Sequence, residues 1–326
     1  MHDGPAHGGT ALTPATGSLR AQAAAAVLMV RPANFGWNSQ TEPSNRFQRA
    51  DAGLMAEAGA RARQEFDALA RDLRQGGVAV HAVADEASPV RPDAVFPNNW
   101  ISLHADGTVV LYPMLAPNRR LERRPELITE LIDRGGFRVD RLLDLTDHER
   151  HDRFLEGTGS VVFDHVARVA YACLSPRTHR EPLEELCVEL GYVACTFNAA
   201  DASGVPIYHT NVMLSIGSQL TVVASETIDA ADRERVLGQL RASGRAIELI
   251  DAAQVARFAG NVLELQADDG GRVLALSATA AEAFGPGGLE RLRRHVQRLV
   301  VAPVPTIEVL GGGSVRCMLA EVFLPR

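Results

Sequence analysis

The sequence contains no lysine, only four cysteines, and no apolar run approaching the roughly 18 residues that a membrane-spanning helix requires. No association with a membrane is therefore expected. No two cysteines have C-x-x-C spacing, and with no recognisable secretion signal we expect free thiols in a reducing cytoplasm. There is also no H-E-x-x-H motif, so neither a metal nor another cofactor is expected.

A positive charge balance is also missing. The formal net charge is -7, and no stripe of basic residues offsets it, so a nucleic acid is not an expected partner. With 46% hydrophobic and 22% charged residues, the composition is that of an ordinary globular protein. The first 24 residues are rich in Gly, Ala, Thr and Pro, which predicts a mobile tail at 1–24 followed by a single domain at 25–326.

One pattern recurs five times along the chain: a helical segment, a glycine or turn, and a short run rich in Val and Ile. These segments, from the end of the helix through the run, lie at residues 74–83, 133–145, 189–197, 242–250 and 297–310. Each strand-like run is followed by a polar loop and an apolar hairpin. These lie at 95–113, 157–175, 208–225, 259–277 and 314–324. A period of about 50–60 residues is compatible with radial repetition around a centre.

The last of these hairpins lacks a return strand, and residues 25–32 can supply it. Pairing of the two segments would join the ends of the chain and close a ring. In a radial arrangement the loops before the hairpins all face the axis at one end. These loops hold the unusual polar residues Asn98, Asn99, Glu156, His209, Asn211, Asn261 and Cys317. Turn formation explains any one of these residues, but not a thiol and a histidine in equivalent positions.

Cys317 is the candidate nucleophile because it lies just after a glycine-rich loop. The other three cysteines, Cys173, Cys187 and Cys195, lie in apolar segments and are expected in the core. A reactive thiolate needs a cationic or hydrogen-bonding neighbour, and Arg316 or a histidine can provide one.

His209 is the candidate acid and base, because it opens an apolar strand after a loop that contains proline. Glu156 is expected to orient the imidazole, with Gly157 and Gly159 permitting close approach of the backbone. A nucleophile, a base and a carboxylate that fixes the base together make the triad arrangement of covalent catalysis.

Seven motifs in this order resemble the guanidine-modifying enzymes, and in particular the branch of citrulline utilization hydrolases. They are VRPANFGWN, DAVFPNNWIS, LEGTGSVVFD, LSPRTH, YHTNVML, FAGNVLEL and SVRCML, within residues 26–326. The resemblance implies the pentein fold, a five-bladed pseudo-symmetric α/β propeller closed here by the N- and C-terminal strands, as one catalytic domain. It also implies that Cys317 is the nucleophile, His209 the catalytic histidine and Glu156 the acid beside it.

The resemblance further implies a set of substrate-binding residues. Arg177 would hold the α-carboxylate of an amino-acid substrate, since its fork of donors suits a carboxylate. Asp93 would bind the α-amino group, and Arg119 matches another arginine on the substrate side. The predicted substrate-binding set also includes Asn98 and Asn261, together with Asn99 and Asn211.

Two asparagines depart from the pattern of enzymes that act on guanidinium groups. Asn99 stands where those enzymes carry a carboxylate, and Asn211 stands where arginine deiminases carry another. The stretch EGTGS likewise lacks the aspartate of the related EGGD motif. An amide cannot balance a buried cation, but it offers the donor and acceptor that a neutral ureido group requires.

We therefore expect a cysteine-dependent hydrolase acting on the ureido or guanidino group of an arginine-related amino acid, with citrulline as the first candidate. Its products would be ornithine, ammonia and carbon dioxide. The alternatives are an arginine deiminase, a dimethylarginine hydrolase or an amidinotransferase, and a pentein that only binds a partner. A homodimer is expected only because dimers are the commonest oligomers.

Overall fold

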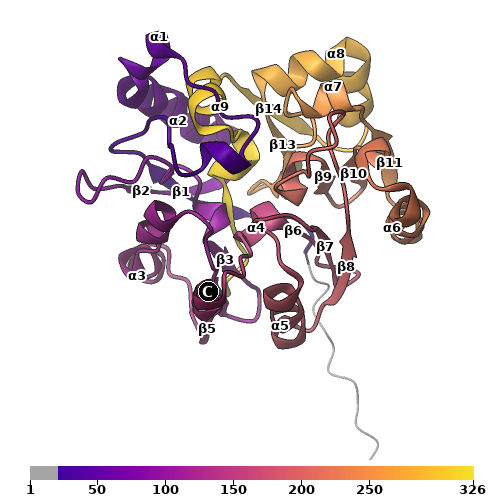
Figure 1. Cartoon of the computed structure of the whole chain (residues 1–326), viewed down its shortest axis with the longest axis horizontal. Helices are drawn as coiled ribbons and strands as arrows, with labels where there is room; N and C mark the ends of the chain where they lie inside the picture. The colour runs from indigo at the N-terminus through magenta and orange to yellow at the C-terminus, as the bar shows by residue number, and fades with distance from the viewer. Residues whose placement is uncertain (1–20) are drawn as a thin grey trace, which may run out of the picture.

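A computed structural model describes residues 21–326, whose strands form four sheets (Figure 1). The largest sheet contains, in spatial order, β2 (Ala79–Ala84), β1 (Ala26–Arg31), β15 (Ala320–Val322), β3 (Ile101–Leu103), β4 (Thr108–Leu111) and β5 (Arg141–Asp144). The other three sheets contain β6 (Val161–Asp164), β7 (Val169–Cys173) and β8 (Val193–Phe197); β9 (Leu214–Ile216), β10 (Leu220–Val223) and β11 (Ala246–Leu249); and β12 (Leu263–Gln266), β13 (Arg272–Ser277) and β14 (Arg298–Ala302).

The three-stranded sheets share one pairing pattern. Two strands form an antiparallel hairpin, and a third strand joins the second in parallel after a helical crossover, as in β6, β7 and β8. The same pattern holds for β9 to β11 and for β12 to β14, and within the large sheet for β3 to β5. Parallel neighbours need such a crossover, which explains why helix and strand alternate in the sequence. The predicted repetition of hairpin, helix and strand is thus confirmed.

The two ends of the described chain lie side by side. β1 pairs antiparallel with β15, with Ala26 opposite Val322, and parallel with β2. The predicted pairing of residues 25–32 with the final segment is therefore confirmed. β15 also meets β3 at the pair Val322 and Leu103, which merges two three-stranded units into the six-stranded sheet.

The long helices lie toward the outside of the molecule and the strands toward its centre (Figure 1). The helices are α1 (Ala52–Met55), α2 (Ala58–Gln75), α3 (Pro125–Asp133), α4 (Gly157–Ser160), α5 (Arg180–Leu190), α6 (Ala230–Ala242), α7 (Ala252–Val255), α8 (Ala278–Arg293) and α9 (Pro305–Gly311). In α2 the buried residues Phe66, Leu69 and Leu73 recur at three- and four-residue steps, so one face of the helix packs on the sheet. Within residues 21–326, none of the helices has the length and apolar content needed to cross a bilayer.

Two sequence-based boundaries are corrected by the structure. The run at 297–310 was expected as a strand, but β14 ends at Ala302 and α9 begins at Pro305, because proline suits the first turn of a helix. The contacts of the domain also begin before residue 25. The buried Gln22 side chain donates hydrogen bonds to the carbonyls of Phe163 and Ile216. Residues 1–20 of the predicted tail lie outside the described residues.

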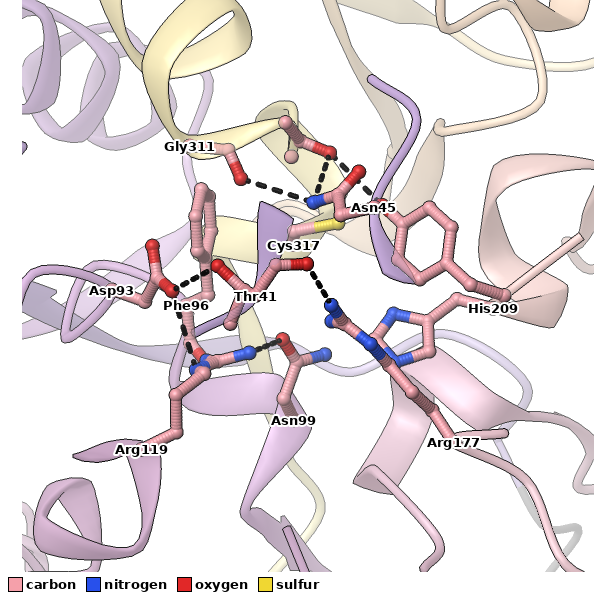
Figure 2. Close-up of a pocket in the computed structure, with 13 residues that line it drawn as sticks. Thr41, Asn45, Asp93, Phe96, Asn99, Arg119, Arg177, His209, Gly311 and Cys317 are labelled. Carbon is pink, nitrogen blue, oxygen red and sulfur yellow. Dashed lines mark hydrogen bonds and ion pairs between the residues drawn. The ribbon is translucent and has the colours of Figure 1, made fainter. Parts of the chain in front are cut away.

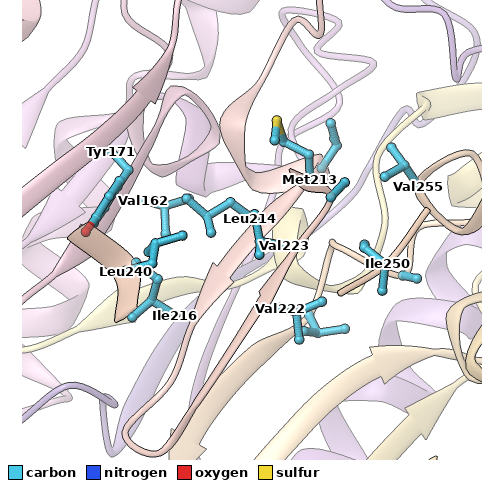
Figure 3. Packing of buried hydrophobic residues seen from close by; sticks show 14 of the residues in the cluster. Val162, Tyr171, Met213, Leu214, Ile216, Val222, Val223, Leu240, Ile250 and Val255 are labelled. Carbon is cyan, nitrogen blue, oxygen red and sulfur yellow. The ribbon is translucent and has the colours of Figure 1, made fainter. Parts of the chain in front are cut away.

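The hydrophobic core fixes the positions of the inner strands. Figure 3 shows Val162 packing beside Leu214, which joins the sheet of β6 to the sheet of β9. Leu214 is fully buried, and truncating such a leucine to alanine typically costs about 2–5 kcal/mol. The loops that precede the inner strands therefore start from rigid anchors. The predicted core cysteines Cys173, Cys187 and Cys195 are all buried.

Candidate active site

Short turns before the inner strands hold most of the predicted site residues. Cys317 lies in the 3-10 turn Val315–Met318 before β15, and His209 directly precedes the turn Thr210–Val212 before β9. Glu156 immediately precedes α4, which leads into β6. Each expected strand start is thus a tight turn, which bends the chain so that side chains from different sheets meet.

Glu156 and His209 form a buried hydrogen-bonded pair. The Nε2 atom of His209 lies 2.9 Å from Oε2 of Glu156, and the backbone N–H of Leu115 donates to Oε1 at 3.1 Å. Although burial raises the pKa of Glu156, the Arg177 guanidinium and the hydrogen bond with His209 lower that pKa to about 2. An ionised carboxylate only accepts hydrogen bonds, so Nε2 carries the proton and Nδ1 keeps its lone pair.

Burial keeps the imidazole neutral over most of the pH range. It lowers the pKa of His209 to about 4, even though the hydrogen bond to Glu156 acts in the opposite direction. A base works only when deprotonated, so kcat/KM should fall on the acid side as pH drops through about 4. A pH profile of kcat/KM measures this limb directly. A limb near the ordinary histidine pKa of about 6.5 would contradict a buried neutral base.

Amide groups surround the sulfur of Cys317. Nδ2 of Asn261 lies 3.3 Å from Sγ and Nδ2 of Asn211 lies 3.6 Å from it, so both can stabilise a thiolate. The buried Arg316 side chain lies 3.9 Å from Glu321 and also interacts electrostatically with Cys317. Two neutral amides and this cation therefore lie around the thiol.

Cys317 and His209 line the same pocket (Figure 2). Of the predicted substrate-binding residues, the pocket also contains Asp93, Asn99, Arg119 and Arg177. Asn211 and Asn261 reach the site through the sulfur. Asn98 does not line the pocket, because its Nδ2 atom donates to Oγ1 of Thr158 at 3.3 Å. Among residues 21–326, no group of three or more His, Cys, Asp or Glu side chains is placed to hold a metal ion.

Two glycines allow the turns to pack this closely. A Cβ atom on Gly159 would lie 2.5 Å from Nδ2 of Asn99 and 2.8 Å from Nδ1 of His209. A Cβ atom on Gly157 would lie 2.2 Å from the carbonyl oxygen of Asn98, and its φ of 49° also favours glycine. The GTG sequence after Glu156 thus lets Asn99 and His209 approach each other.

Asp93 and Arg177 are both engaged by the loop that follows β1. Asn38 donates through Nδ2 to Oδ2 of Asp93 at 2.7 Å. Arg177 donates through Nη2 to the carbonyl of Thr41 at 2.9 Å and to Oγ of Ser44 at 2.7 Å. This loop therefore covers the two groups that the resemblance assigns to an amino-acid head group.

Sequence reasoning missed these loop residues as part of the site, along with Tyr208 and Glu122. Tyr208 lines the pocket, and its hydroxyl donates to the carbonyl of Gly312 at 2.9 Å. The stretch NFGWNSQTEPSN carries a usable signal, namely an unusually polar segment directly after a buried strand. Nothing in the spacing of Glu122 indicates its contact with Arg119, which only the coordinates reveal.

Comparison with known proteins gives a family match over most of the chain. The sequence profile described as N,N dimethylarginine dimethylhydrolase, eukaryotic, matches residues 31–324. A search of the curated proteins found no match.

Solved structures share the fold at low sequence identity. Apo ArgZ, an arginine dihydrolase from the ornithine-ammonia cycle in cyanobacteria, is 17% identical with a TM-score of 0.71, over 92% of this chain and 41% of that one. The present chain thus spans about two fifths of the length of that enzyme. The substrate-bound N-terminal domain of ArgZ is 16% identical, with a TM-score of 0.70, over 92% and 98% of the two chains.

A dimethylarginine dimethylaminohydrolase bound as an adduct with 4-chloro-2-hydroxymethylpyridine is also similar. It is 14% identical, with a TM-score of 0.61, and the match covers 90% of this chain and 98% of that one. At these identities the structural likeness establishes the mixed α/β fold of the guanidine-modifying enzymes.

Proposed function

The chain belongs to the N,N dimethylarginine dimethylhydrolase family of guanidine-modifying C–N hydrolases, and from that premise we propose that it is a cysteine hydrolase that converts citrulline to ornithine, ammonia and carbon dioxide. Cys317 is the nucleophile, His209 the acid and base, and Glu156 the residue that orients His209. The family membership supports hydrolysis at the central carbon of a guanidino or ureido group. The choice between those two groups depends on the pocket of this chain.

The orientation of one amide is the observation that carries the choice of a ureido substrate. Oδ1 of Asn99 accepts a hydrogen bond from Nη1 of Arg119 at 2.9 Å, so the NH₂ group of Asn99 points the other way (Figure 2). That NH₂ group is buried and has no hydrogen-bond partner among residues 21–326. A ureido oxygen accepts from such a donor, whereas a guanidinium has only donors and would leave both groups unsatisfied.

The charges in the pocket support the same choice. Its lining includes one carboxylate, Asp93, and two guanidinium groups, Arg119 and Arg177. Citrulline is a neutral zwitterion, and its ammonium and carboxylate match Asp93 and Arg177 in charge. Arginine would bring one more cation, for which the part of the lining that the structure describes supplies no second carboxylate.

The proposed reaction has two stages. Nδ1 of His209 takes the thiol proton, Sγ of Cys317 attacks the ureido carbon, and the negative oxygen is held by the Asn99 donor with backbone N–H groups of the glycine loop. His209 then gives its proton to the leaving ornithine amine, which leaves a carbamoyl group on sulfur. Water activated by His209 releases carbamate, which breaks down to ammonia and carbon dioxide.

A guanidino substrate is the second candidate. The family is named for dimethylarginine, and the ArgZ enzyme is named as an arginine dihydrolase. Two buried acceptors, Oδ1 of Asp93 and Oδ1 of Asn211, have no hydrogen-bond partner among the described residues and suit guanidinium N–H groups. Arginine, dimethylarginine and amidino transfer to an amine therefore belong in the same assay.

We extend the proposal to the architecture and the setting of the chain. The five repeats of inner strand, hairpin partner and crossover strand support a closed five-bladed propeller with the pocket on its axis. Assignment to the citrulline utilization branch follows from the substrate proposal. A cytoplasmic location, a homodimer and the absence of a cofactor stay predictions.

The test is a substrate panel with purified protein. We expect ornithine and ammonia from citrulline, with kcat/KM at least about 100-fold above that for arginine or dimethylarginine. Each of these two substrates would place a guanidinium N–H group against the NH₂ group of Asn99, so that two donors face each other. Ornithine and ammonia from arginine but not from citrulline would overturn the substrate. Absence of turnover on every compound would favour a pentein that only binds.

A further inference from the structure

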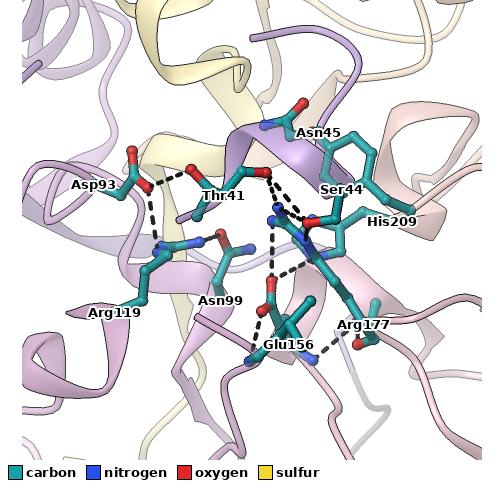
Figure 4. Close-up of polar contacts among 12 residues, drawn as sticks. Thr41, Ser44, Asn45, Asp93, Asn99, Arg119, Glu156, Arg177 and His209 are labelled. Atoms are coloured by element: carbon teal, nitrogen blue, oxygen red, sulfur yellow. Dashed lines mark hydrogen bonds and ion pairs between the residues drawn. The ribbon is translucent and has the colours of Figure 1, made fainter. Parts of the chain in front are cut away.

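Arg119 contacts four groups of the protein from a fully buried position, and one of them is Oδ2 of Asp93, which lies 3.8 Å from its Nε atom. Its Nε and Nη2 atoms donate to the two carboxylate oxygens of Glu122, each at 2.9 Å. Its Nη1 atom donates to Oδ1 of Asn99 at 2.9 Å, as Figure 4 shows. Nη2 also reaches the carbonyl of Phe96 at 3.4 Å. Four of the five guanidinium N–H groups are therefore used within the protein.

This arrangement determines which end of the Asn99 amide faces the ligand. A guanidinium has no acceptor, so Asn99 can present only its oxygen to Arg119. Within residues 21–326, the side chain of Asn99 has no other hydrogen-bond partner that would oppose a rotation exchanging its oxygen and nitrogen. Glu122 in turn holds the guanidinium in a two-point grip, which fixes the plane of Arg119.

We propose that Glu122 and Arg119 form a relay that fixes the polarity of the Asn99 amide and thereby selects a hydrogen-bond acceptor on the reacting group of the substrate. Arg119 and Glu122 are then positioning residues that act through Asn99. The inference rests on the proposed function, because the selected acceptor is the ureido oxygen. It replaces the expected role of Arg119 as a direct ligand of the substrate.

The relay and direct binding of the substrate carboxylate predict different results. If Arg119 held the α-carboxylate, removing Arg119 would weaken only substrates that possess a carboxylate. If Arg119 orients Asn99, its removal would weaken citrulline and decarboxylated citrulline by the same factor. The ratio of citrulline to arginine would also fall, because a free amide can rotate and offer its oxygen to a guanidinium N–H.

The decisive variant is the double substitution Arg119→Met with Glu122→Gln, which removes both members of the two-point pair, while Asp93, 3.8 Å from Nε of Arg119, keeps its hydrogen bond from Asn38. In it we expect the citrulline-to-arginine ratio of kcat/KM to fall about tenfold, with equal losses for citrulline and its decarboxylated analogue. The single variant Glu122→Gln should lower the ratio in the same direction by a smaller factor. An unchanged ratio, or a loss confined to substrates with a carboxylate, would overturn the relay.

Arg123→Met is the matched control. Arg123 lies four residues after Arg119 in the sequence, its Nη2 atom donates to Glu149 at 3.1 Å, and it does not line the pocket. We expect Arg123→Met to keep the wild-type ratio, while circular dichroism confirms that all variants are folded. A fall of the ratio in Arg123→Met equal to that in the double variant would assign the effect to general destabilisation and reject the relay.

A binding experiment separates the relay from the proposed reaction. Dissociation constants for citrulline and arginine, measured by calorimetry in a Cys317→Ala background, give the same ratio without turnover. Wild-type preference for arginine in the assay would reject the substrate, whereas a binding ratio that is insensitive to Arg119→Met with Glu122→Gln would reject the relay.

Discussion

Replacing Cys317 by alanine should lower kcat/KM for citrulline by about 10⁴-fold or more, because the covalent route has no other nucleophile. Cys317 is the cysteine that lines the pocket, and its sulfur receives two amide donors. The substitution removes one small buried atom, so the fold should persist with a modest loss of stability. Ornithine release in a discontinuous assay measures turnover, and thermal unfolding measures stability.

Cys187→Ala is the matched control for this experiment. Cys187 is also buried, but it lies in α5 within an apolar cluster that contains none of the pocket residues. We expect Cys187→Ala to lower the melting temperature while leaving kcat within about twofold of the wild-type value. Turnover by Cys317→Ala within tenfold of the wild-type rate would remove the thiol from the reaction.

Exchanging Asn99 for aspartate should reverse the preference between ureido and guanidino substrates. The aspartate would present a carboxylate oxygen where Asn99 now presents its NH₂ group. That oxygen repels the ureido oxygen and its developing negative charge, but it accepts from a guanidinium N–H. We expect the citrulline-to-arginine ratio of kcat/KM to fall by about 10³-fold, since kcat/KM for citrulline falls while kcat/KM for arginine rises.

Asn98→Asp provides the same chemical change at the neighbouring residue. Asn98 is buried, but its side chain contacts Thr158 and does not line the pocket. We expect this variant to be less stable, because it buries an unpaired carboxylate, yet to keep the wild-type substrate ratio. If both aspartate variants shift the ratio equally, local distortion would replace the hydrogen-bond explanation.

The repeat of hairpin, helix and strand explains why the central residues of the site could be predicted from the sequence. Cys317, His209 and Glu156 occupy equivalent places before inner strands, and the repeated hairpins make that equivalence visible in the sequence. The same argument brings Asn211 and Asn261 to the sulfur. Residues selected by their place in the repeat are therefore found near one another.

Side-chain direction limits the prediction elsewhere. Asn98 and Asn99 are neighbours in the turn Pro97–Asn99, yet only Asn99 lines the pocket, because successive residues of a tight turn point in different directions. Arg316, which is next to Cys317 in the sequence, interacts electrostatically with the thiol, but its pairing with Glu321 could not be predicted from the sequence. The spacing of residues in the sequence predicts where the backbone lies. The contacts of a side chain depend on its rotamer and on its hydrogen-bond and ion-pair partners.

Tertiary contacts between loops that are distant in the sequence also could not be predicted from the sequence. Ser44 lies 133 residues before Arg177, and no local pattern indicates that its hydroxyl accepts from that guanidinium. The helix at Pro305–Gly311 was missed because the run before it is rich in valine, and a short apolar segment fits a strand or a helix equally well.

Mass spectrometry of the quenched enzyme tests the central claim most directly. Wild-type protein mixed with citrulline and acid-quenched within one turnover should carry one carbamoyl group on the peptide that contains Cys317, and the adduct should be absent from His209→Ala. Steady turnover of citrulline with no adduct on that peptide, or with the adduct on another cysteine, would contradict covalent catalysis by Cys317.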